Sequence, residues 1–445
     1  MWFAGCVEAS APTPSRSWRE LPGTTTALVL TAVALLTVGY GLLAKAAGVN
    51  LGVPLPPFFA HWEPQVDPAA IVAIPLFALA VAAAVRLARA EVGAGAFVVA
   101  IFAVTLLARL SVSAARDGTE GFSAMFGSSP EAANEYLPAL PALHSLGLHD
   151  FLDRFAEISP TLPIHPSAHP PGTLLLLDAL GIDTAEGMAW LVILVGALAV
   201  PLTYWLARGL GVADDRSRAA ALLLALSPSA LLYGVTSTDS LFATLGMVSA
   251  CLLVGSGALR RIAGALALAA AAFFSWALLA LGAFAVVATA VKDGLRSALA
   301  LALVAGVVLV AVYAALYAAT GFDPVGAIRA AGEAYDLGIS NARPYLYWLF
   351  GSPVAFVVAL GLPTAWYAAR ALGTANAAAV GLAAIIIVSV LVGLTKAETE
   401  RIWLFMGPPA AVAAASMVPL RRMPLILGLL AAQALACSLL LFTIW

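Results

Sequence analysis

Long apolar runs recur along this chain from residue 25 to residue 443, and they limit what it can fold into. A helix needs about 20 apolar residues to cross the hydrocarbon core of a bilayer, and most of these runs are close to that length. Of the 445 residues, 62% are hydrophobic and 10% are charged, whereas soluble domains carry about 25% charged residues. So few charges could not cover the surface of a water-soluble globule. We therefore predict an all-α polytopic membrane protein.

The apolar runs predict thirteen transmembrane helices, at residues 25–46, 69–87, 93–112, 187–207, 217–236, 239–259, 262–276, 278–292, 297–318, 348–369, 375–395, 403–420 and 424–443. The chain then divides into a tail (1–24), a first group of three helices (25–112), a large hydrophilic loop (113–186) and the remaining bundle (187–445), which has further hydrophilic loops at 319–347 and 395–402. No Lys, Arg, Asp or Glu is expected near the middle of a span.

The distribution of charge over the loops predicts the orientation in the membrane. With the N terminus in the cytoplasm, most of the 22 Lys and Arg fall in cytoplasmic connections, and Arg109 is among the few that fall outside. Most of the 24 Asp and Glu and all five His are also assigned to the outside. We therefore expect a multi-pass protein of the cell membrane whose titratable chemistry faces the extracytoplasmic side. The net charge of −2 gives no sign of a nucleic-acid partner.

The large loop, 113–186, is the most informative hydrophilic segment. Residues 131–155 mix aromatic residues and leucines with acids and His at a loosely helical spacing, as expected of helices that lie in the membrane interface. The segment HPSAHPPG at 165–172 follows, and each Pro favours an extended conformation for the residue before it. A helix over 173–182 would be about 15 Å long, which is too short to cross the bilayer core.

Four motifs, in order, carry a family resemblance. They are HPPG followed by a short Leu-rich helix (169–182), YWLARGLG (204–211), ALSPSALLY (225–233) and TDSLF (238–242). In this order and spacing they resemble the polyprenyl-phosphate-dependent glycosyltransferases of the GT-C fold. More narrowly, they are similar to the branch that contains the protein O-mannosyltransferases and the aminoarabinose transferases of lipid A. The resemblance is strongest over residues 130–260.

The resemblance implies a GT-C bundle that moves one hexose or pentose, such as mannose or arabinose, from a polyprenyl-phosphate donor. The acceptor would be a hydroxyl of a glycan, lipid or protein on the outer face. In this family an acid of the first large exterior loop, usually in an Asp-Glu pair before a Tyr, acts as the base. Here that position holds Asn134, Glu135 and Tyr136, so Glu135 is the implied base and Tyr136 an implied substrate contact. Asp117 and Glu120 remain alternatives, because the pair is reduced to Asn-Glu and two extra helices precede the loop.

The chemistry of such a reaction has requirements of its own. An acceptor hydroxyl that attacks the anomeric carbon must lose its proton to a carboxylate, and cations must stabilise the departing phosphate. Inversion by direct displacement needs one base. Leu and Pro residues near Glu135 could bury it and raise its pKa, although it could also be a solvated loop acid. Asp117 and Glu120 follow Arg116 and could simply pair with it.

Asp239 lies at the outer end of two predicted spans, between Thr238 and Ser240. Its carboxylate can cap the helix that begins at Ser240 by accepting hydrogen bonds from free backbone N–H groups. The resemblance adds a second role for Asp239, in the donor or catalytic pocket.

Three cations, Arg343, Lys396 and Arg401, fall outside against the positive-inside trend. Binding of the lipid phosphate would explain them, because Arg can bind a phosphate through two hydrogen bonds. The alternative is anchoring at the membrane interface, together with Trp348 and Trp403.

The remaining candidates are acids and histidines. Glu398 and Glu400 are candidate substrate-binding residues, and Glu398 would share a helix face with Arg401 three residues later. His165 and His169 bracket the Pro-rich turn, where they could bind a divalent metal, hydrogen-bond the donor phosphate or line the interface. No cofactor is required by the pattern, and we assign no metal ligand.

Two other classes of membrane protein fit the composition. A transporter or flippase of a lipid-linked cell-envelope precursor is the main alternative, but it would be expected to have internal repeats, broken helices or ionisable groups near the midplane, and none is evident in the sequence. A membrane acyltransferase with a buried catalytic His is the other, and the exterior assignment of all five His argues against it.

Overall fold

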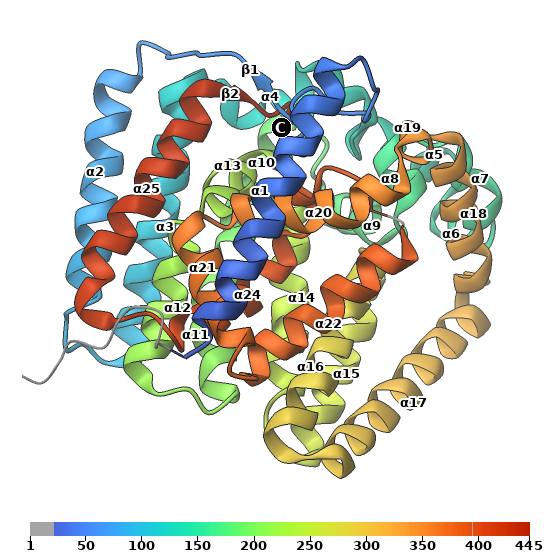
Figure 1. Ribbon diagram of the computed structural model, residues 1–445. Helices are drawn as coiled ribbons and strands as arrows, with labels where there is room; N and C mark the ends of the chain where they lie inside the picture. The colour runs from blue at the N-terminus through green and yellow to red at the C-terminus, as the bar shows by residue number, and fades with distance from the viewer. Residues whose placement is uncertain (1–21, 394) are drawn as a thin grey trace, which may run out of the picture.

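The computed structural model describes residues 22–393 and 395–445, and it is almost entirely helical (Figure 1). Within these residues, seven helical segments are long and apolar enough to cross a membrane. Helices α10 and α11 are counted as one segment. The seven segments are α1 (Thr24–Ala46), α2 (Ala70–Leu87), α3 (Ala94–Asp117), α10 with α11 (Ala185–Ala197 and Ala199–Gly209), α16 (Leu279–Asp293), α17 (Leu295–Thr320) and α25 (Met423–Leu440). Turns of 3-10 helix precede α16 and α25, at Trp276–Leu278 and Leu420–Arg422.

Two further pairs of helices reach spanning length only together, and each pair is bent. Helices α12 (Asp214–Ala225) and α13 (Pro228–Thr236) meet at 56°, and α20 (Tyr345–Ala359) and α21 (Leu362–Leu372) meet at 118°. Pro228 has no N–H to continue the ladder of α12, and Gly361 has a φ of 98°, which residues with a side chain rarely adopt. The predicted spans 217–236 and 348–369 are therefore bent, and the expectation that the chain lacks broken helices is wrong.

The other predicted spans are shorter apolar helices. They are α14 (Asp239–Leu253), α15 (Ala258–Ala272), α22 (Ala377–Val392) and α24 (Gly407–Ala415) with the 3-10 turn Leu404–Met406 before it. Each of the thirteen predicted runs thus coincides with helix, and the short pair 262–276 and 278–292 is two separate helices. The prediction of a helical chain with many helices apolar and long enough to span a membrane is confirmed. The number thirteen is not, because among the described residues seven helices have the length and composition of a span, or nine with the bent pairs.

Helix α14 lies at the centre of the bundle, and small residues let its neighbours approach closely. It packs against α10, α11, α15 and α16, and most of its residues are buried. A Cβ atom added at Gly196 of α10 would lie 2.0 Å from Ser240 Oγ, so only glycine fits at this crossing. This packing holds the first residue of α14, Asp239, at one end of the bundle core.

Helix α3 is longer than the sequence predicts. It continues to Asp117 instead of ending near residue 112. Arg109, whose charge was assigned to the outside, lies within this helix and is buried in the bundle.

The loop 113–186 folds into short helices that gather with the other two hydrophilic loops in the upper part of Figure 1. They are α4 (Gly121–Gly127), α5 (Leu140–Leu146), α6 (Leu148–Asp153), α7 (Phe155–Ile158), α8 (Ile164–Ala168) and α9 (Gly172–Leu180), with 3-10 turns at Pro130–Asn134, Leu137–Ala139 and Ser159–Thr161. The other two loops contribute α18 (Pro324–Leu337), α19 (Ile339–Ala342) and α23 (Thr399–Ile402). We call this the loop end of the bundle. The short helices predicted for this loop are confirmed, including the one near 173–182.

A two-stranded ribbon joins distant parts of the chain at the loop end. Strand β1 (His61–Trp62), between α1 and α2, pairs antiparallel with β2 (Leu441–Phe442), directly after α25, and His61 lies opposite Phe442. The ribbon brings the segment after α25 over the loop helices. This ribbon was not predicted from the sequence.

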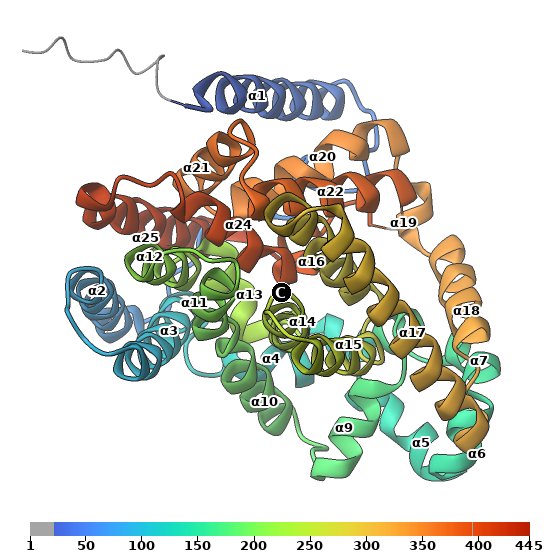
Figure 2. The ribbon, with the colours of Figure 1, turned by 90° about the horizontal axis from the view of Figure 1, so that it is seen from below.

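Basic side chains satisfy helix ends on the opposite side of the bundle, which Figure 2 shows from below. Arg216 Nη1 donates a hydrogen bond of 2.6 Å to the last carbonyl of α24. Lys292 donates to the end of α11 at 3.0 Å, and Arg260 to a carbonyl near the end of α14 at 3.0 Å. Because the last carbonyls of a helix lack backbone partners and carry partial negative charge, these cations stabilise the ends that they contact.

Candidate active site at the loop end

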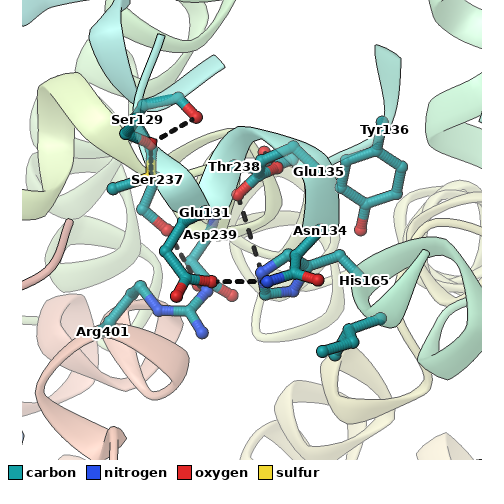
Figure 3. Close-up of polar contacts among 12 residues, drawn as sticks. Ser129, Glu131, Asn134, Glu135, Tyr136, His165, Ser237, Thr238, Asp239 and Arg401 are labelled. Carbon is teal, nitrogen blue, oxygen red and sulfur yellow. Dashed lines mark hydrogen bonds and ion pairs between the residues drawn. The ribbon is translucent and has the colours of Figure 1, made fainter. Parts of the chain in front are cut away.

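Glu135 is buried in a pocket between the loop helices and the start of α14. It directly follows the 3-10 turn Pro130–Asn134 and is 2% exposed. One carboxylate oxygen lies 3.6 Å from His165 Nε2, and the other accepts a hydrogen bond of 3.4 Å from Thr238 Oγ1 (Figure 3). The side chain of Asn134, beside it in sequence, turns away and donates to Glu131 at 2.7 Å.

The surroundings of Glu135 tune its acidity. Burial raises the pKa of its carboxyl from 4.5 to about 7, and the neighbouring carboxylate of Asp239 also raises it. The positive charge of Arg401 and hydrogen bonding from Trp445 and Thr238 act in the opposite direction. Desolvation dominates because the ionised form loses more hydration than these partners restore. At neutral pH this carboxyl is therefore about half ionised, as suits a general base.

Asp239 and Arg401 form a buried ion pair next to Glu135. Arg401 Nη1 lies 2.7 Å from Asp239 Oδ2, and the same oxygen accepts a hydrogen bond of 2.9 Å from Ser237 Oγ. The expected capping role of Asp239 is wrong, because Thr238 is the N-cap residue of α14 and the side chain that accepts the first backbone N–H of the helix, at 3.2 Å, is that of Ser237. The carboxylate turns to the guanidinium instead, since a buried charge is stabilised most by an opposite charge.

Arg401 also connects this pair to a second carboxylate. Its Nη2 lies 3.1 Å from Glu398, and Glu398 in turn lies 3.0 Å from Arg343, so the four charges alternate in sign. Glu398 was predicted to share a helix face with Arg401; it lies just before α23, as its N-cap residue, and still forms this ion pair. Ala397 and Glu398 have positive φ values of 69° and 59°, a conformation that costs about 1–3 kcal/mol for such residues and is typical of functional segments.

One nitrogen of the Arg401 guanidinium remains available for further contacts. Its Nε atom is buried and makes no hydrogen bond. The ring of Trp445 lies 3.9 Å from the guanidinium carbon and also packs edge-on against His165. Stacking on an aromatic face holds the guanidinium plane in place.

His165 and His169 are both neutral at physiological pH. Burial lowers the pKa of His169 to about 4 and that of His165 well below its usual value, and Arg401 lowers both further. Burial also raises the pKa of Tyr136, so its hydroxyl stays protonated, and it is hydrogen-bonded to His169 Nδ1. His169 has the extended conformation expected before Pro, but His165 does not, because it lies within α8.

The pocket is lined by residues from three distant segments. They are Glu135, Tyr136, His165, His169, Thr238, Asp239, Phe242 and Arg401. Among residues 22–393 and 395–445, no group of three or more His, Cys, Asp or Glu is placed to hold a metal ion.

Two of the predicted acids lie away from this pocket. Asp117 and Glu120 are both exposed at the end of α3. Asp117 lies 3.6 Å from Arg116 and accepts a hydrogen bond from Gln65, as the simple pairing predicts. Glu135 is thus the candidate base that the fold places among the other site residues.

The two remaining cations, Lys396 and Arg343, bond to backbone carbonyls next to the pocket. Lys396 donates to the carbonyls of Asn341 and Arg343 at 3.3 and 3.2 Å, and Arg343 donates back to the Lys396 carbonyl at 2.5 Å. Neither lines the pocket. The alternative prediction was that these cations anchor the chain at the membrane interface together with Trp348 and Trp403. It is wrong, because both Trp side chains are buried inside the protein, each 1% exposed.

Glu400, in α23, contacts the loop between α1 and α2 and does not line the pocket. One of its oxygens accepts the backbone N–H of Phe59 at 2.8 Å, and the other has no partner. Burial raises the pKa of Glu400 to about 7. Phe59 also lies over the guanidinium of Arg343.

The charged cluster is the chain of ion pairs from Asp239 through Arg401 and Glu398 to Arg343. The residues that were not predicted from the sequence are Thr238 and Phe242, together with Phe59 and Trp445, which cover this cluster. The first two belong to the TDSLF motif and could have been taken with Asp239. Phe59 and Trp445 carry no local signal, because the β1–β2 ribbon alone brings them here.

Comparisons with protein-family models, with curated proteins and with solved structures found no match to this chain.

Proposed function

We propose that the protein is an integral membrane glycosyltransferase. It would transfer one sugar from a polyprenyl-phosphate donor to a hydroxyl acceptor, with inversion at the anomeric carbon. The observation that carries this proposal is one pocket that holds a buried carboxyl with a pKa of about 7, Glu135, beside a buried guanidinium, Arg401. A displacement of this kind needs a base on one side of the reacting carbon and a cation on the other.

Glu135 is the proposed general base. The acceptor oxygen forms a bond to the anomeric carbon while the bond from that carbon to the phosphate oxygen breaks. The acceptor proton moves to Glu135, and polyprenyl phosphate leaves. Thr238 and His165 hold the carboxylate from two sides, so its direction is set before the substrate binds.

Arg401 is the proposed ligand of the donor phosphate. Its unpartnered Nε can donate to a phosphate oxygen, and Asp239 and Glu398 fix the guanidinium in position through its other nitrogens. Tyr136 and His169 lie next to the base, where a sugar would be bound. Because both histidines are neutral, Arg401 would be the main source of positive charge for the leaving group.

The loop end would face the extracytoplasmic side of the cell membrane, with the N terminus in the cytoplasm. The supporting observation is the gathering of basic residues at the opposite end, where the positive-inside rule places the cytoplasm. The lipid chain of the donor would lie in the bilayer, with its phosphate at the level of the pocket.

The direct test uses purified protein in detergent with a radiolabelled polyprenyl-phosphate sugar. A glycosyltransferase releases polyprenyl phosphate only when an acceptor is present, and the label moves to that acceptor. If no labelled product forms with any glycan, lipid or peptide acceptor, the proposal fails.

Transport of a lipid-linked precursor is the second candidate. The observation in its favour is the two bent helix pairs, α12–α13 and α20–α21, since discontinuous helices are common in transporters. Movement of unmodified precursor across sealed vesicles, without release of polyprenyl phosphate, would support transport in place of transfer.

A further inference from the structure

Arg109 is a buried cation deep inside the helical bundle. It lies about 12 Å along α3 from the terminal Asp117. It is 2% exposed, and its side chain crosses to α13 and α14. Ionisable side chains at such a depth in a membrane protein are costly and normally face a partner.

No carboxylate of the described residues forms an ion pair with Arg109. Its Nη1 donates to the Gly234 carbonyl and to Ser240 Oγ, both at 3.2 Å, and its buried Nε makes no hydrogen bond. Asp239, the nearest acid in sequence to Ser240, is paired with Arg401. The positive charge of Arg109 is therefore left without a counter-charge.

Arg109 lines a small cavity whose other walls are almost entirely apolar. The lining residues are Arg109, Gly196, Ala199, Leu224, Ala230, Ser240, Ala243, Leu404 and Pro408. Its centre has about 10 Å³ of room, which is enough for about one water-sized species. Glycines make space for both polar groups, since a Cβ at Gly234 would lie 2.4 Å from Arg109 Nε.

We propose that this cavity binds a monovalent anion of the size of chloride. Its two polar side chains offer the unpartnered Arg109 Nε–H and the Ser240 O–H as donors. A cation would be repelled by Arg109, and a water molecule would leave the buried positive charge without a counter-charge. An anion completes the hydrogen bonding and neutralises the buried charge. This site is independent of sugar transfer.

Bromide tests the site directly, because it replaces chloride and scatters anomalously. Crystals of the full chain grown in sodium bromide should show an anomalous peak within hydrogen-bonding distance of Arg109 and Ser240. A map with bromide elsewhere, or with water alone in this cavity, would overturn the proposal.

Thermal unfolding in detergent gives a second test that avoids replacing Arg109. With sodium gluconate keeping ionic strength constant, chloride should raise the Tm of the wild type in a saturable manner. The Ser240→Ala variant should need about tenfold more chloride for the same rise, because one hydrogen bond to a charged group is lost. Ser249→Ala is the matched control, since Ser249 lies on the same helix and donates to Gly246. Equal chloride responses in Ser240→Ala and the wild type, or none in either, would refute the proposal.

Discussion

Replacing Glu135 with Gln should separate the catalytic role of this carboxyl from its effect on the fold. Gln has the same shape, so the Thr238 hydroxyl keeps an acceptor, but it cannot take a proton from the sugar acceptor. General bases typically contribute 10²- to 10⁴-fold, and we expect the transfer rate to fall by about that factor. Donor binding should change little, because Arg401 is untouched.

The same substitution should stabilise the folded protein at high pH. The pKa of Glu135 is raised from 4.5 to about 7 on folding, so the folded state favours the protonated form. Its contribution is neutral below pH 4.5 and becomes destabilising as the pH rises through 7. At 1.36 kcal/mol per pKa unit, the penalty above pH 7 is about 3 kcal/mol, and Gln removes it.

The two effects can be measured on one preparation. Transfer of label from the donor gives the rate from pH 5 to 9, and thermal unfolding gives the Tm over the same range. The wild-type rate should fall about tenfold per pH unit below 7, and the Tm of the variant should exceed that of the wild type by a margin that grows from pH 5 to 7 and then stays constant. Asp117→Asn is the control for activity, since Asp117 is an exposed acid paired with Arg116 away from the pocket, and it should leave the rate profile unchanged.

A Glu135→Gln protein that transfers sugar at the wild-type rate would refute the assignment of the base. A variant whose Tm falls at every pH would instead refute the argument that desolvation dominates at this carboxyl. A loss of activity together with a gain in stability at high pH is expected of a strained catalytic group.

Three further predictions concern the charged cluster and the packing of α10 against α14. Arg401→Lys should raise the donor KM about tenfold or more, because an ammonium cannot replace the hydrogen bonds of a guanidinium to phosphate. Asp239→Asn should instead lower kcat, because the Arg401 guanidinium is no longer held in position. Steady-state kinetics at varied donor concentration distinguish the two effects. Lys396→Met should lower the Tm without changing the donor KM, because Lys396 bonds only to backbone carbonyls here; an increase in KM would place it in the donor site instead. Gly196→Ala should destabilise the folded protein by about 1–3 kcal/mol, since the added Cβ would overlap Ser240. Gly428→Ala is the control and should not destabilise it, because a Cβ at Gly428 would have nothing within 4 Å. Denaturant or thermal unfolding compares the two variants.

The positions of the helices could be predicted from the sequence because they depend on local composition. A run of apolar residues is helical wherever it lies in the bundle, since its backbone must be satisfied within the segment. The same local information placed the short helices of loop 113–186. Bends are less visible, because Pro228 and Gly361 resemble many other prolines and glycines of this chain that do not break a helix.

The site itself was decided by the tertiary structure. The sequence alone pointed to Glu135, Asp239 and Arg401 as separate candidates, but nothing local says that α23 lies against the start of α14. Which carboxylate is desolvated, and which cation faces it, depends on burial by segments far away in the chain. Trp445 reaches Arg401 only through the β1–β2 ribbon, and Arg109 is buried because α13 and α14 pack against its side chain. Composition thus determined that the chain is a bundle of apolar helices, while long-range packing determined which of its few charges meet.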